Sequence, residues 1–398
     1  MLANHDRFDT VWVIDPGCLQ LPGHHCMWNR AIHSLLQAQG LPHSFLVSER
    51  AAPDVLQSLD NAVAHFSFNF YRQVDESPTL EALESLVAHS FYMQRDMAAL
   101  SERVTSRTLI FGHSLDAPSI LGLALWHAAL PLERRPCLAL TIHFCFRMPT
   151  DATRACYRLA VRNFAPSSTV RFFVVADHIG AFLRSCAIRD VFSLPMLIEA
   201  GGARGSIDIP RRLVFGFTGE DRPERNVAIL PEAIRQYIEN GGTGDFLLHL
   251  SPSVQSDNAV KASLAALQTR YPERVRVFYG YMTPREYYSL FQEISVLLLP
   301  FPATLYHYFR PSQVLQEALA FGLPAIVCRG GFLEYESRKW DNGSLAIPDA
   351  TAASLVNGMR VFEKDAQVRC AKGVEAGKRY RSVNTPDNFW QSILAAFE

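Results

Sequence analysis

The chain has 398 residues, of which 48% are hydrophobic and 19% are charged, and its formal net charge is -1. This length accommodates two domains of ordinary size, and the hydrophobic content is too high for a globally disordered chain. A nearly neutral chain is also a poor match for a nucleic-acid binder, which uses an excess of Lys and Arg to neutralise phosphates.

The cysteines indicate a reducing environment. No CxxC pattern occurs, and the eight residues stand singly, at positions 18, 26, 137, 145, 156, 186, 328 and 370. This usage favours reduced, buried thiols over a disulfide framework or a zinc site. The first ten residues are polar, without the pattern of a signal peptide, and no apolar run approaches the roughly 20 residues of a membrane helix. We therefore expect a cytoplasmic protein.

Short apolar runs alternate with helical stretches along the whole chain, which predicts an α/β fold with parallel sheets covered by helices. In the first half the expected strands are Val11–Asp15, Ser44–Val47, Leu109–His113, Ala139–Phe144, Arg171–Val175 and Val191–Leu194. In the second half they are Leu213–Phe217, Phe246–Leu250, Val275–Tyr279, Val296–Pro300, Ala325–Cys328 and Ser344–Ile347.

A glycine-rich run at 200–206, followed by Pro210, interrupts this alternation and is the best candidate for a linker. We expect two Rossmann-like domains, residues 1–205 and 206–380, with a ligand cleft between them. Residues 381–398 are expected to form a closing amphipathic helix, because four apolar residues share one face: Trp390, Ile393, Leu394 and Phe397.

The first strand leads into a loop with Gly17 and Gly23 and then a helix from about Met27 to Gln39. Strand, glycine loop and helix are typical of the opening of a nucleotide-binding domain, but the glycines do not form GxGxxG and are weak evidence alone. His24 and His25 end this loop. They either reach a substrate or are solvated loop residues.

Two further histidines end predicted strands, His113 after LeuIlePheGly and His143 after LeuThrIle. The carboxyl ends of parallel strands face the ligand in this architecture, so both are candidates for a hydrogen bond to a substrate or for proton handling near neutral pH. Asp116 is a further possible contact. The alternative for each histidine is a satisfied structural role.

Arginines recur after this strand, first at Arg147 and then at Arg154, Arg158 and Arg162, whose spacing of four places them on one helix face. The stripe could meet an acceptor pyrophosphate or an anionic membrane surface. A solvated helix face is the more common reason for such a pattern.

The stretch from Arg310 to Glu334 combines several features of a ligand site. Ser312 is a good N-cap for a helix, and Gly322 suits the left-handed residue that ends one. The strand that follows runs into Gly330 and Gly331. Amides at the helix start favour an anion, Arg310 stands just before that start, and the Glu317 carboxylate can accept from sugar hydroxyls.

This stretch resembles the donor-binding segment of GT-B glycosyltransferases, especially the retaining enzymes of glycosyltransferase family 4. Their signature is a Glu, seven residues, a second Glu, Ala-x-x-x-Gly-x-Pro, a short apolar strand and a Gly-Gly turn. The matching positions are Glu317, Ala318, Gly322, Pro324, Ala325, Ile326, Val327, Gly330, Gly331 and Glu334. The first Glu is not matched, because Phe309 stands eight residues before Glu317.

The resemblance implies roles for individual residues. Glu317 would hold the nucleotide ribose, and Arg225 matches a family Lys that grips the donor diphosphate. The partner Arg of the family would fall near Gly219, where the match fails, and Arg222 is its possible replacement. Tyr281 lies where the family has a turn beside the nucleobase. The donor-binding set is Gly219, Arg222, Arg225, Tyr281, Arg310, Pro311, Ser312, Gln313, Glu317, Gly330 and Gly331.

In the first domain, the resemblance implies that His143 lies near the donor sugar, with His113 as the second catalytic candidate. Gly23, His24 and His25 would line the acceptor side, and the closing helix within 381–398 could cross back onto this domain, as the last helix often does in the GT-B fold. The chain has no DxD triplet, the pair that holds a divalent ion on the diphosphate in metal-dependent glycosyltransferases. We therefore predict no metal site and no cofactor besides the donor itself.

The resemblance as a whole implies a GT-B glycosyltransferase of polysaccharide biosynthesis that acts with retention. It would move a sugar from a UDP- or GDP-type donor to a glycan, a lipid-linked or another acceptor. Peripheral contact with the inner face of the membrane would be compatible with this role. Two alternatives stay open: a sugar-nucleotide epimerase, and an inactive homologue that binds a nucleotide or a partner, for which Phe309 is the main support.

Overall fold

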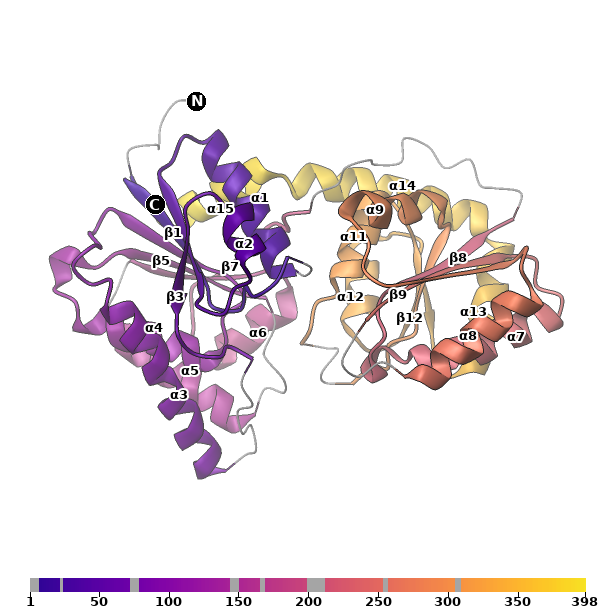
Figure 1. The fold of residues 1–398 in the computed structure, drawn as a ribbon, viewed down its shortest axis with the longest axis horizontal. Helices are drawn as coiled ribbons and strands as arrows, with labels where there is room; N and C mark the ends of the chain where they lie inside the picture. Colours follow the sequence, from indigo (N-terminus) through magenta and orange to yellow (C-terminus); the bar gives the residue numbers. More distant parts are fainter. Residues whose placement is uncertain are drawn as a thin grey trace. The chain divides into compact units, whose positions relative to one another are not determined.

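The computed structural model describes residues 7–21, 24–71, 79–143, 150–164, 169–198, 212–252, 257–304 and 309–398, the side chain of His24 excepted. The chain divides into two compact units (Figure 1). The first comprises Met1–Leu197 together with Asn384–Glu398, and the second comprises Ile198–Val383. The expected linker at 200–210 lies outside the described residues.

The first unit is built on a seven-stranded parallel sheet with the order β3-β2-β1-β4-β5-β6-β7. Its central strands are almost completely buried, as expected for apolar strands covered on both faces. The strands are β1 Thr10–Asp15, β2 His43–Ser48, β3 Ala62–Phe66, β4 Thr108–Gly112, β5 Cys137–Ile142, β6 Val170–Val174 and β7 Val191–Ser193.

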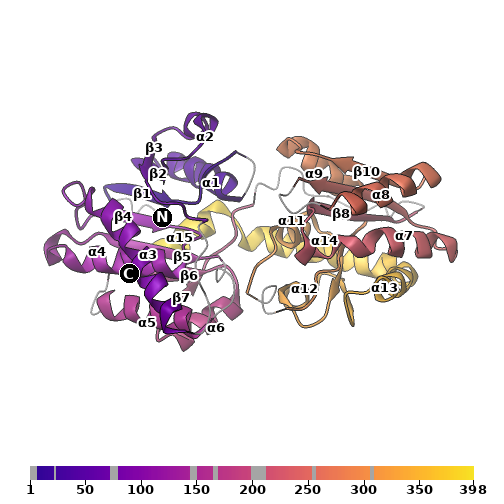
Figure 2. The same ribbon diagram turned by 60° about the horizontal axis from the view of Figure 1, so that its bottom comes forward.

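The helices of this unit pack in two groups, which Figures 1 and 2 show on either side of the sheet. One group contains α3, α4 and α5, and the other contains α1 and α15. The helices are α1 His24–Ala38, α2 Pro53–Ser58, α3 Leu80–Ala98, α4 Ala117–Ala129, α5 Asp151–Phe164, α6 Asp177–Ser185 and α15 Pro386–Ala396, with a short 3-10 turn η1 at Leu132–Arg134.

The second unit repeats the design with six parallel strands in the order β10-β9-β8-β11-β12-β13. They are β8 Val214–Glu220, β9 Asp245–Ser251, β10 Val275–Tyr279, β11 Val296–Leu299, β12 Ala325–Cys328 and β13 Leu345–Ile347. The helices are α7 Leu230–Glu239, α8 Asn258–Arg270, α9 Pro284–Glu293, α11 Gln313–Phe321, α12 Phe332–Trp340, α13 Ala352–Lys364 and α14 Ala366–Val383, with 3-10 turns η2 Pro223–Arg225 and η3 Val227–Ile229.

This architecture confirms the predicted α/β class with two parallel sheets. Strand β3 was not expected, because it lies at the sheet edge and exposes part of its short sequence. The prediction that the first helix begins near Met27 was wrong, since α1 begins at His24. Ser312 caps α11 and Gly322 ends it with a φ of 76°, both as predicted.

The last helix returns to the first unit. Phe389 of α15 packs edge-on against the rings of Trp28 and Phe111, with ring centroids 5.9 and 5.7 Å apart. Arg171 of β6 donates a hydrogen bond to the carbonyl of Ala396. The terminal helix therefore packs on apolar core residues of α1 and β4 in the first unit.

Two helical glycines of the first unit differ in the space around them. A Cβ on Gly122 of α4 would lie 2.3 Å from the carbonyl oxygen of Ser90 on α3, whereas a Cβ on Gly180 of α6 would meet nothing closer than 3.4 Å. We expect Gly122→Ala to lower the free energy of unfolding by about 1–3 kcal/mol because α3 and α4 must separate. Gly180→Ala should be neutral or stabilising by up to about 1 kcal/mol through its helix propensity. Urea unfolding of both variants measures this difference, and equal midpoints would contradict it.

Candidate functional site

Both sheets have a switch point, where strand order reverses and ligands bind beyond the carboxyl ends of the strands. In the first sheet it lies between β1 and β4, and in the second between β8 and β11. Asp15 is the last residue of β1 and His113 follows β4 directly. The loop with Arg222 and Arg225 follows β8. Polar side chains thus stand at both switch points, and His113 and the two arginines among them were named from the sequence.

In the second unit, Arg225 reaches back over the end of β8. A Cβ on Gly219, whose φ is 138°, would lie 2.0 Å from Nη1 of Arg225, so only glycine leaves room for this guanidinium. Asn226 adopts a left-handed conformation with φ 56° and donates from Nδ2 to the carbonyl of Ala350 at 2.7 Å. Asn226 therefore fixes the loop directly after the arginine.

Arg225 belongs to a cluster of three arginines with Arg222 and Arg310. Nη1 of Arg225 is shielded from solvent and has no hydrogen-bond partner among the described residues. Burial lowers the pKa of Arg225 below its ordinary value, and Arg222 lowers it further. Burial, followed by Arg222 and Arg225, lowers the pKa of Arg310 to about 10. An ion pair between Arg222 and Glu220 balances part of this charge.

Glu317 is completely enclosed, on the second turn of α11. Its Oε2 accepts a hydrogen bond from the Tyr287 hydroxyl at 2.7 Å, and its Oε1 accepts one from Gln313 at 3.3 Å. Burial raises the pKa of Glu317 to about 7, and the two donors and the charge of Arg225 oppose this rise. A carboxyl of this kind takes up a proton, or a hydrogen-bond donor, readily near neutral pH.

Polar groups at the start of α11 and in the Gly330–Gly331 turn already make hydrogen bonds within the unit. They are therefore less available to a ligand than the sequence indicates. The Ser312 hydroxyl accepts from the Leu315 amide at 3.3 Å, so it serves the helix cap. The Gly330 amide donates to Glu334 at 2.8 Å, and Gly330 has a φ of 85°. An anion at this turn would have to compete with Glu334 for that amide.

Some predicted donor residues make no contact with the arginine cluster among the contacts that the structure describes. Tyr281 is 66% exposed beyond the end of β10. Pro311 is half-buried at the N-terminal side of α11. Phe309, at the position of the unmatched family Glu, is buried.

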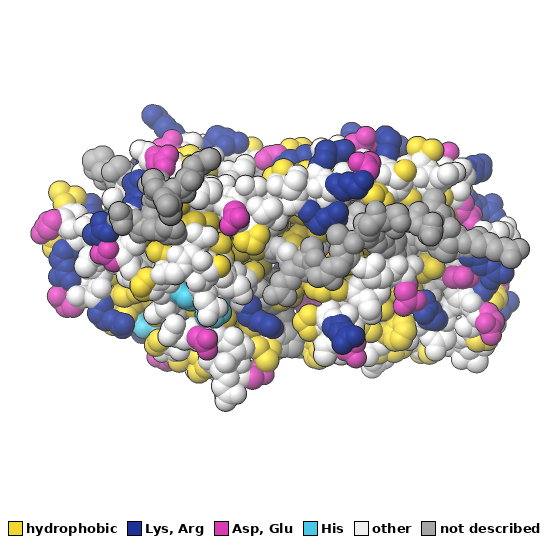
Figure 3. Space-filling view, turned by 90° about the horizontal axis from the view of Figure 1, so that it is seen from above, with side chains coloured by type: hydrophobic (Ala, Val, Ile, Leu, Met, Phe, Trp, Pro, Cys, Tyr) yellow, Lys and Arg dark blue, Asp and Glu magenta, His cyan; other side chains and the backbone are white. Residues whose placement is uncertain are grey.

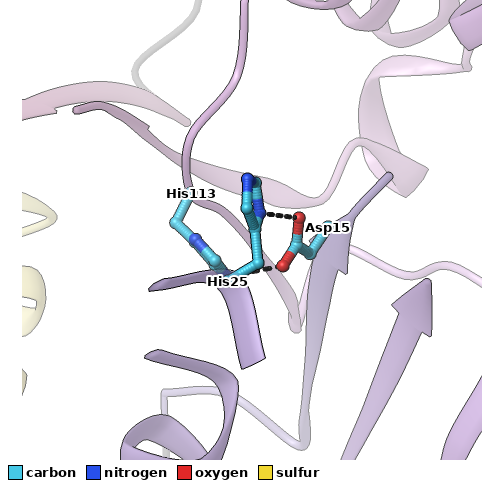
Figure 4. A group of neighbouring side chains, drawn as sticks. All are labelled: Asp15, His25 and His113. Carbon is cyan, nitrogen blue, oxygen red and sulfur yellow. Dashed lines mark hydrogen bonds and ion pairs between the residues drawn. The ribbon is translucent and has the colours of Figure 1, made fainter. Parts of the chain in front are cut away.

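In the first unit, the structure gathers Asp15, His25, Asn29 and His113 into one buried group. Figure 4 draws the carboxylate and the two imidazoles of this group. His25 Nδ1 lies 2.7 Å from Asp15 Oδ1, and His113 Nε2 lies 3.3 Å from Asp15 Oδ2. Asn29 donates to Asp15 Oδ2 at 2.8 Å and its Oδ1 lies 2.8 Å from His113 Nε2. Burial would raise the pKa of Asp15, but His25 and His113 outweigh it and hold this pKa well below its usual range.

His143 lies beside this group without joining its hydrogen bonds. Its ring packs edge-on against Trp28, with centroids 4.1 Å apart, and lies 5.9 Å from the ring of His113. Burial, together with the neighbouring His113 and His25, holds the pKa of His143 well below its usual range. Nε2 of His143 is buried with no hydrogen-bond partner among the described residues. The imidazole is therefore neutral near pH 7 and offers a polar atom to a ligand.

The remaining predictions for the first unit have mixed outcomes. His25 is buried in α1, so a solvated loop residue is the wrong interpretation for it. Asp116 caps α4 by accepting from the Ser119 amide at 2.9 Å, which gives it a structural role. Gly23, Arg147 and the side chain of His24 lie outside the described residues.

The arginine stripe of α5 is partly engaged within the unit. Arg154 bonds to the Ser185 hydroxyl and lies over the ring of Phe182, and Arg158 donates to the Ser185 carbonyl at 3.3 Å. Figure 3 draws another face, seen from above the view of Figure 1, on which acidic and basic side chains are interspersed. Among the described helices, none is both long and apolar enough to cross a membrane.

Sequence reasoning missed three residues of these groups: Asp15, Asn29 and Tyr287. Asp15 ends a strand, a position that could have singled it out by the same argument that singled out the strand-end histidines. Asn29 and Tyr287 lie inside helices and reach the sites only through the fold. The described cysteines, all buried, form no disulfide, as the sequence predicted.

Comparisons with known proteins identify the fold. No protein-family model matches the chain, and no curated protein matches its sequence. Among solved structures, sucrose-phosphate synthase from Thermosynechococcus elongatus is similar over 98% of this chain and 100% of its own, with a TM-score of 0.68 and 14% identity. An α,α-trehalose 6-phosphate synthase from Burkholderia multivorans is similar over 98% and 96%, with a TM-score of 0.63 and 9% identity.

A TarM variant from S. aureus, solved with fondaparinux, alpha-GlcNAc-glycerol and UDP, is similar over 98% of this chain and 100% of its own. Its TM-score is 0.64 and its identity is 8%. These neighbours are GT-B glycosyltransferases, so the chain has the GT-B fold predicted from its sequence. At such identities the likeness establishes the fold alone.

The raised pKa of Glu317 makes stability depend on pH. The folded chain holds this proton with a pKa of about 7 against an ordinary 4.5, so the contribution of Glu317 to stability is complete below pH 4.5 and is lost as pH rises through 7. The full shift corresponds to about 3 kcal/mol. We expect Glu317→Gln to melt at a higher temperature than wild type at pH 8.5 but not at pH 4.5. Calorimetry measures this, with exposed Glu273→Gln as the control, and a pH-independent difference would contradict it.

Proposed function

We propose that this protein is a glycosyltransferase that moves a sugar from a nucleotide diphosphate donor to an acceptor. The observation that carries the proposal is the grouping of Arg225, Arg310 and Glu317 at the switch point of the second sheet. A guanidinium whose shielded Nη1 has no described partner suits an anion, and the enclosed carboxylate beside it suits hydroxyl groups.

The chemistry follows from these charges. When the bond between the anomeric carbon and the diphosphate oxygen breaks, negative charge grows on the leaving diphosphate. Arg225 and Arg310, both partly removed from water, would stabilise that charge with little reorganisation. The acceptor oxygen would form the new bond to the anomeric carbon and pass its proton to the departing diphosphate oxygen. Glu317 would hold the ribose by exchanging the Tyr287 hydroxyl for a ribose hydroxyl.

The finer assignments follow the resemblance of the donor segment. We propose a UDP- or GDP-type donor, transfer with retention, and no metal ion on the diphosphate because arginines take its place. The TarM structure, with its bound UDP, supports a uridine nucleotide as the first donor to test. The donor set is completed by Gly219, Arg222, Tyr281, Pro311, Ser312, Gln313, Gly330 and Gly331.

We propose that the first unit binds the acceptor. Its class would be a glycan or a lipid-linked sugar, handled by a cytoplasmic enzyme with peripheral membrane contact. Gly23, His24 and His25 stand on the acceptor side. His143 is the candidate for contact with the reacting sugar because its Nε2 is available, and His113 is the second. Residues 1–205 would form the acceptor domain, 206–380 the donor domain and 381–398 the closing helix.

Nucleotide binding tests the donor site directly. Titration calorimetry with UDP and GDP should detect one site on the wild-type chain. Arg225→Ala and Glu317→Ala should each weaken binding by about 10- to 100-fold, because each removes hydrogen bonds to a charged group.

Arg235→Ala is the matched control. Arg235 also lies in the second unit, but its partners are the surface carboxylates Glu232 and Glu239 of the same helix. Its removal should leave affinity unchanged. If both Arg225→Ala and Glu317→Ala bound the nucleotide with wild-type affinity, the donor-site assignment would be contradicted.

A further inference from the structure

The buried group of the first unit contains a metal-ligand set that linear spacing does not reveal. Asp15, His25 and His113 each offer one ligand atom, and these atoms lie within 4.8 Å of one another. They come from the end of β1, the first turn of α1 and the residue after β4 (Figure 4). Asp15 and His113 therefore flank the switch point, where this fold places ligands.

The donor atoms define the class of ion. Two imidazole nitrogens and one carboxylate oxygen suit divalent transition metals, and Zn²⁺ above all, since it binds nitrogen and oxygen at about 2.0–2.2 Å. Mg²⁺ and Ca²⁺ prefer an all-oxygen shell and would gain little from two imidazoles. A single carboxylate also leaves a positive net charge on the bound ion, which favours a further oxygen ligand.

The surroundings of the three residues hold them in place. The Gly17 amide donates to Asp15 Oδ1 at 3.1 Å, and Asn29 donates to Oδ2, so the carboxylate is fixed from both sides. The Ser114 hydroxyl lies 3.3 Å from Nδ1 of His113 and can accept a hydrogen bond from a protonated Nδ1, in the tautomer that leaves Nε2 as the ligand atom. Outer partners of this kind orient metal ligands in proteins.

Gly17 also makes the close approach of His25 possible. A Cβ at this position would lie 2.4 Å from Cε1 of the His25 ring, so any other residue would displace that imidazole. The chain thus uses a glycine to bring a histidine against a buried carboxylate.

We propose that Asp15, His25 and His113 bind one divalent transition-metal ion, with Zn²⁺ as the best match. Three protein ligands leave a coordination position for a water or for an oxygen of a ligand of this unit. The proposal is independent of the donor site, which lies in the other unit. On binding, His113 Nε2 would exchange Asn29 Oδ1 for the ion, and His25 Nδ1 would give up its hydrogen bond to Asp15.

The rival interpretation is a purely structural network, in which the same hydrogen bonds only stabilise the fold. A second group of similar composition provides a control. Near the surface, His33 Nδ1 lies 2.9 Å from His43 Nε2, and His33 Nε2 lies 3.8 Å from Asp60 Oδ2. Adventitious metal binding would occur at these surface histidines and would be lost in His33→Gln. This variant therefore distinguishes the surface group from the buried one.

Metal titration of the full chain, stripped with chelator, tests the proposal. We expect one Zn²⁺ or Co²⁺ per chain, a rise in melting temperature with Zn²⁺, and no response to Mg²⁺. Bound Co²⁺ should give absorption typical of nitrogen and oxygen ligands, without a thiolate charge-transfer band. Absence of Zn²⁺ and Co²⁺ binding, or a thiolate band, would overturn the proposal.

Variants locate the ion. Asp15→Asn and His113→Gln should each lower the affinity for Zn²⁺ by more than about tenfold, and His33→Gln should leave it unchanged. A cooperative thermal unfolding transition in the presence of chelator shows that each variant is folded. Should one of the buried variants fail to fold, the other buried variant and His33→Gln still decide, because unaltered cobalt binding in His33→Gln excludes the surface group. Unaltered affinity in both buried variants, or its loss in His33→Gln, would overturn the site.

Discussion

The candidate site of the second unit depends on the guanidinium of Arg225, whose Nη1 is shielded from solvent at the end of a parallel sheet. Arg225 brings its charge over the end of β8, and Gly219 is the residue that makes room for it. Transferring an ion from water without full compensation is unfavourable, so the unliganded unit holds a charge that an anion would stabilise. Glu317 is near enough to interact with this charge, yet burial still leaves its pKa at about 7. A ligand with both phosphates and hydroxyls would satisfy the two groups together.

The two units use the same topology for different chemistry. In both sheets the first strand and the fourth meet at the switch point, and the polar residues follow those strands. The second unit concentrates cations there, whereas the first concentrates imidazoles around one carboxylate. Because the strands themselves are apolar, each sheet can bury its core and confine its charges to one edge.

Local features of the fold could be read from the sequence where local forces determine them. The central strands are short apolar runs, and Ser312 and Gly322 mark the ends of α11 through cap chemistry. Strand β3 was missed because an edge strand needs no continuous apolar run. The start of α1 was missed because His24 and His25 follow a glycine-containing segment that indicated a loop.

The sites were predictable only in part, for a physical reason. Glu317 and Arg225 could be named because they belong to a segment with a recognisable pattern. Tyr287 could not, because its hydroxyl meets Glu317 across 30 positions of sequence through the packing of α9 near α11. Asp15 and His113 are almost 100 residues apart and meet because β1 and β4 are neighbours. Contacts of this type depend on topology, which local spacing does not encode.

The structure of the chain with bound UDP would test the central claim most directly. We expect the diphosphate to contact the guanidinium groups of Arg225 and Arg310. We also expect a ribose hydroxyl to take the place of the Tyr287 hydroxyl at Glu317. A nucleotide bound away from β8 and α11, or one that leaves Arg225 without a phosphate contact, would contradict it.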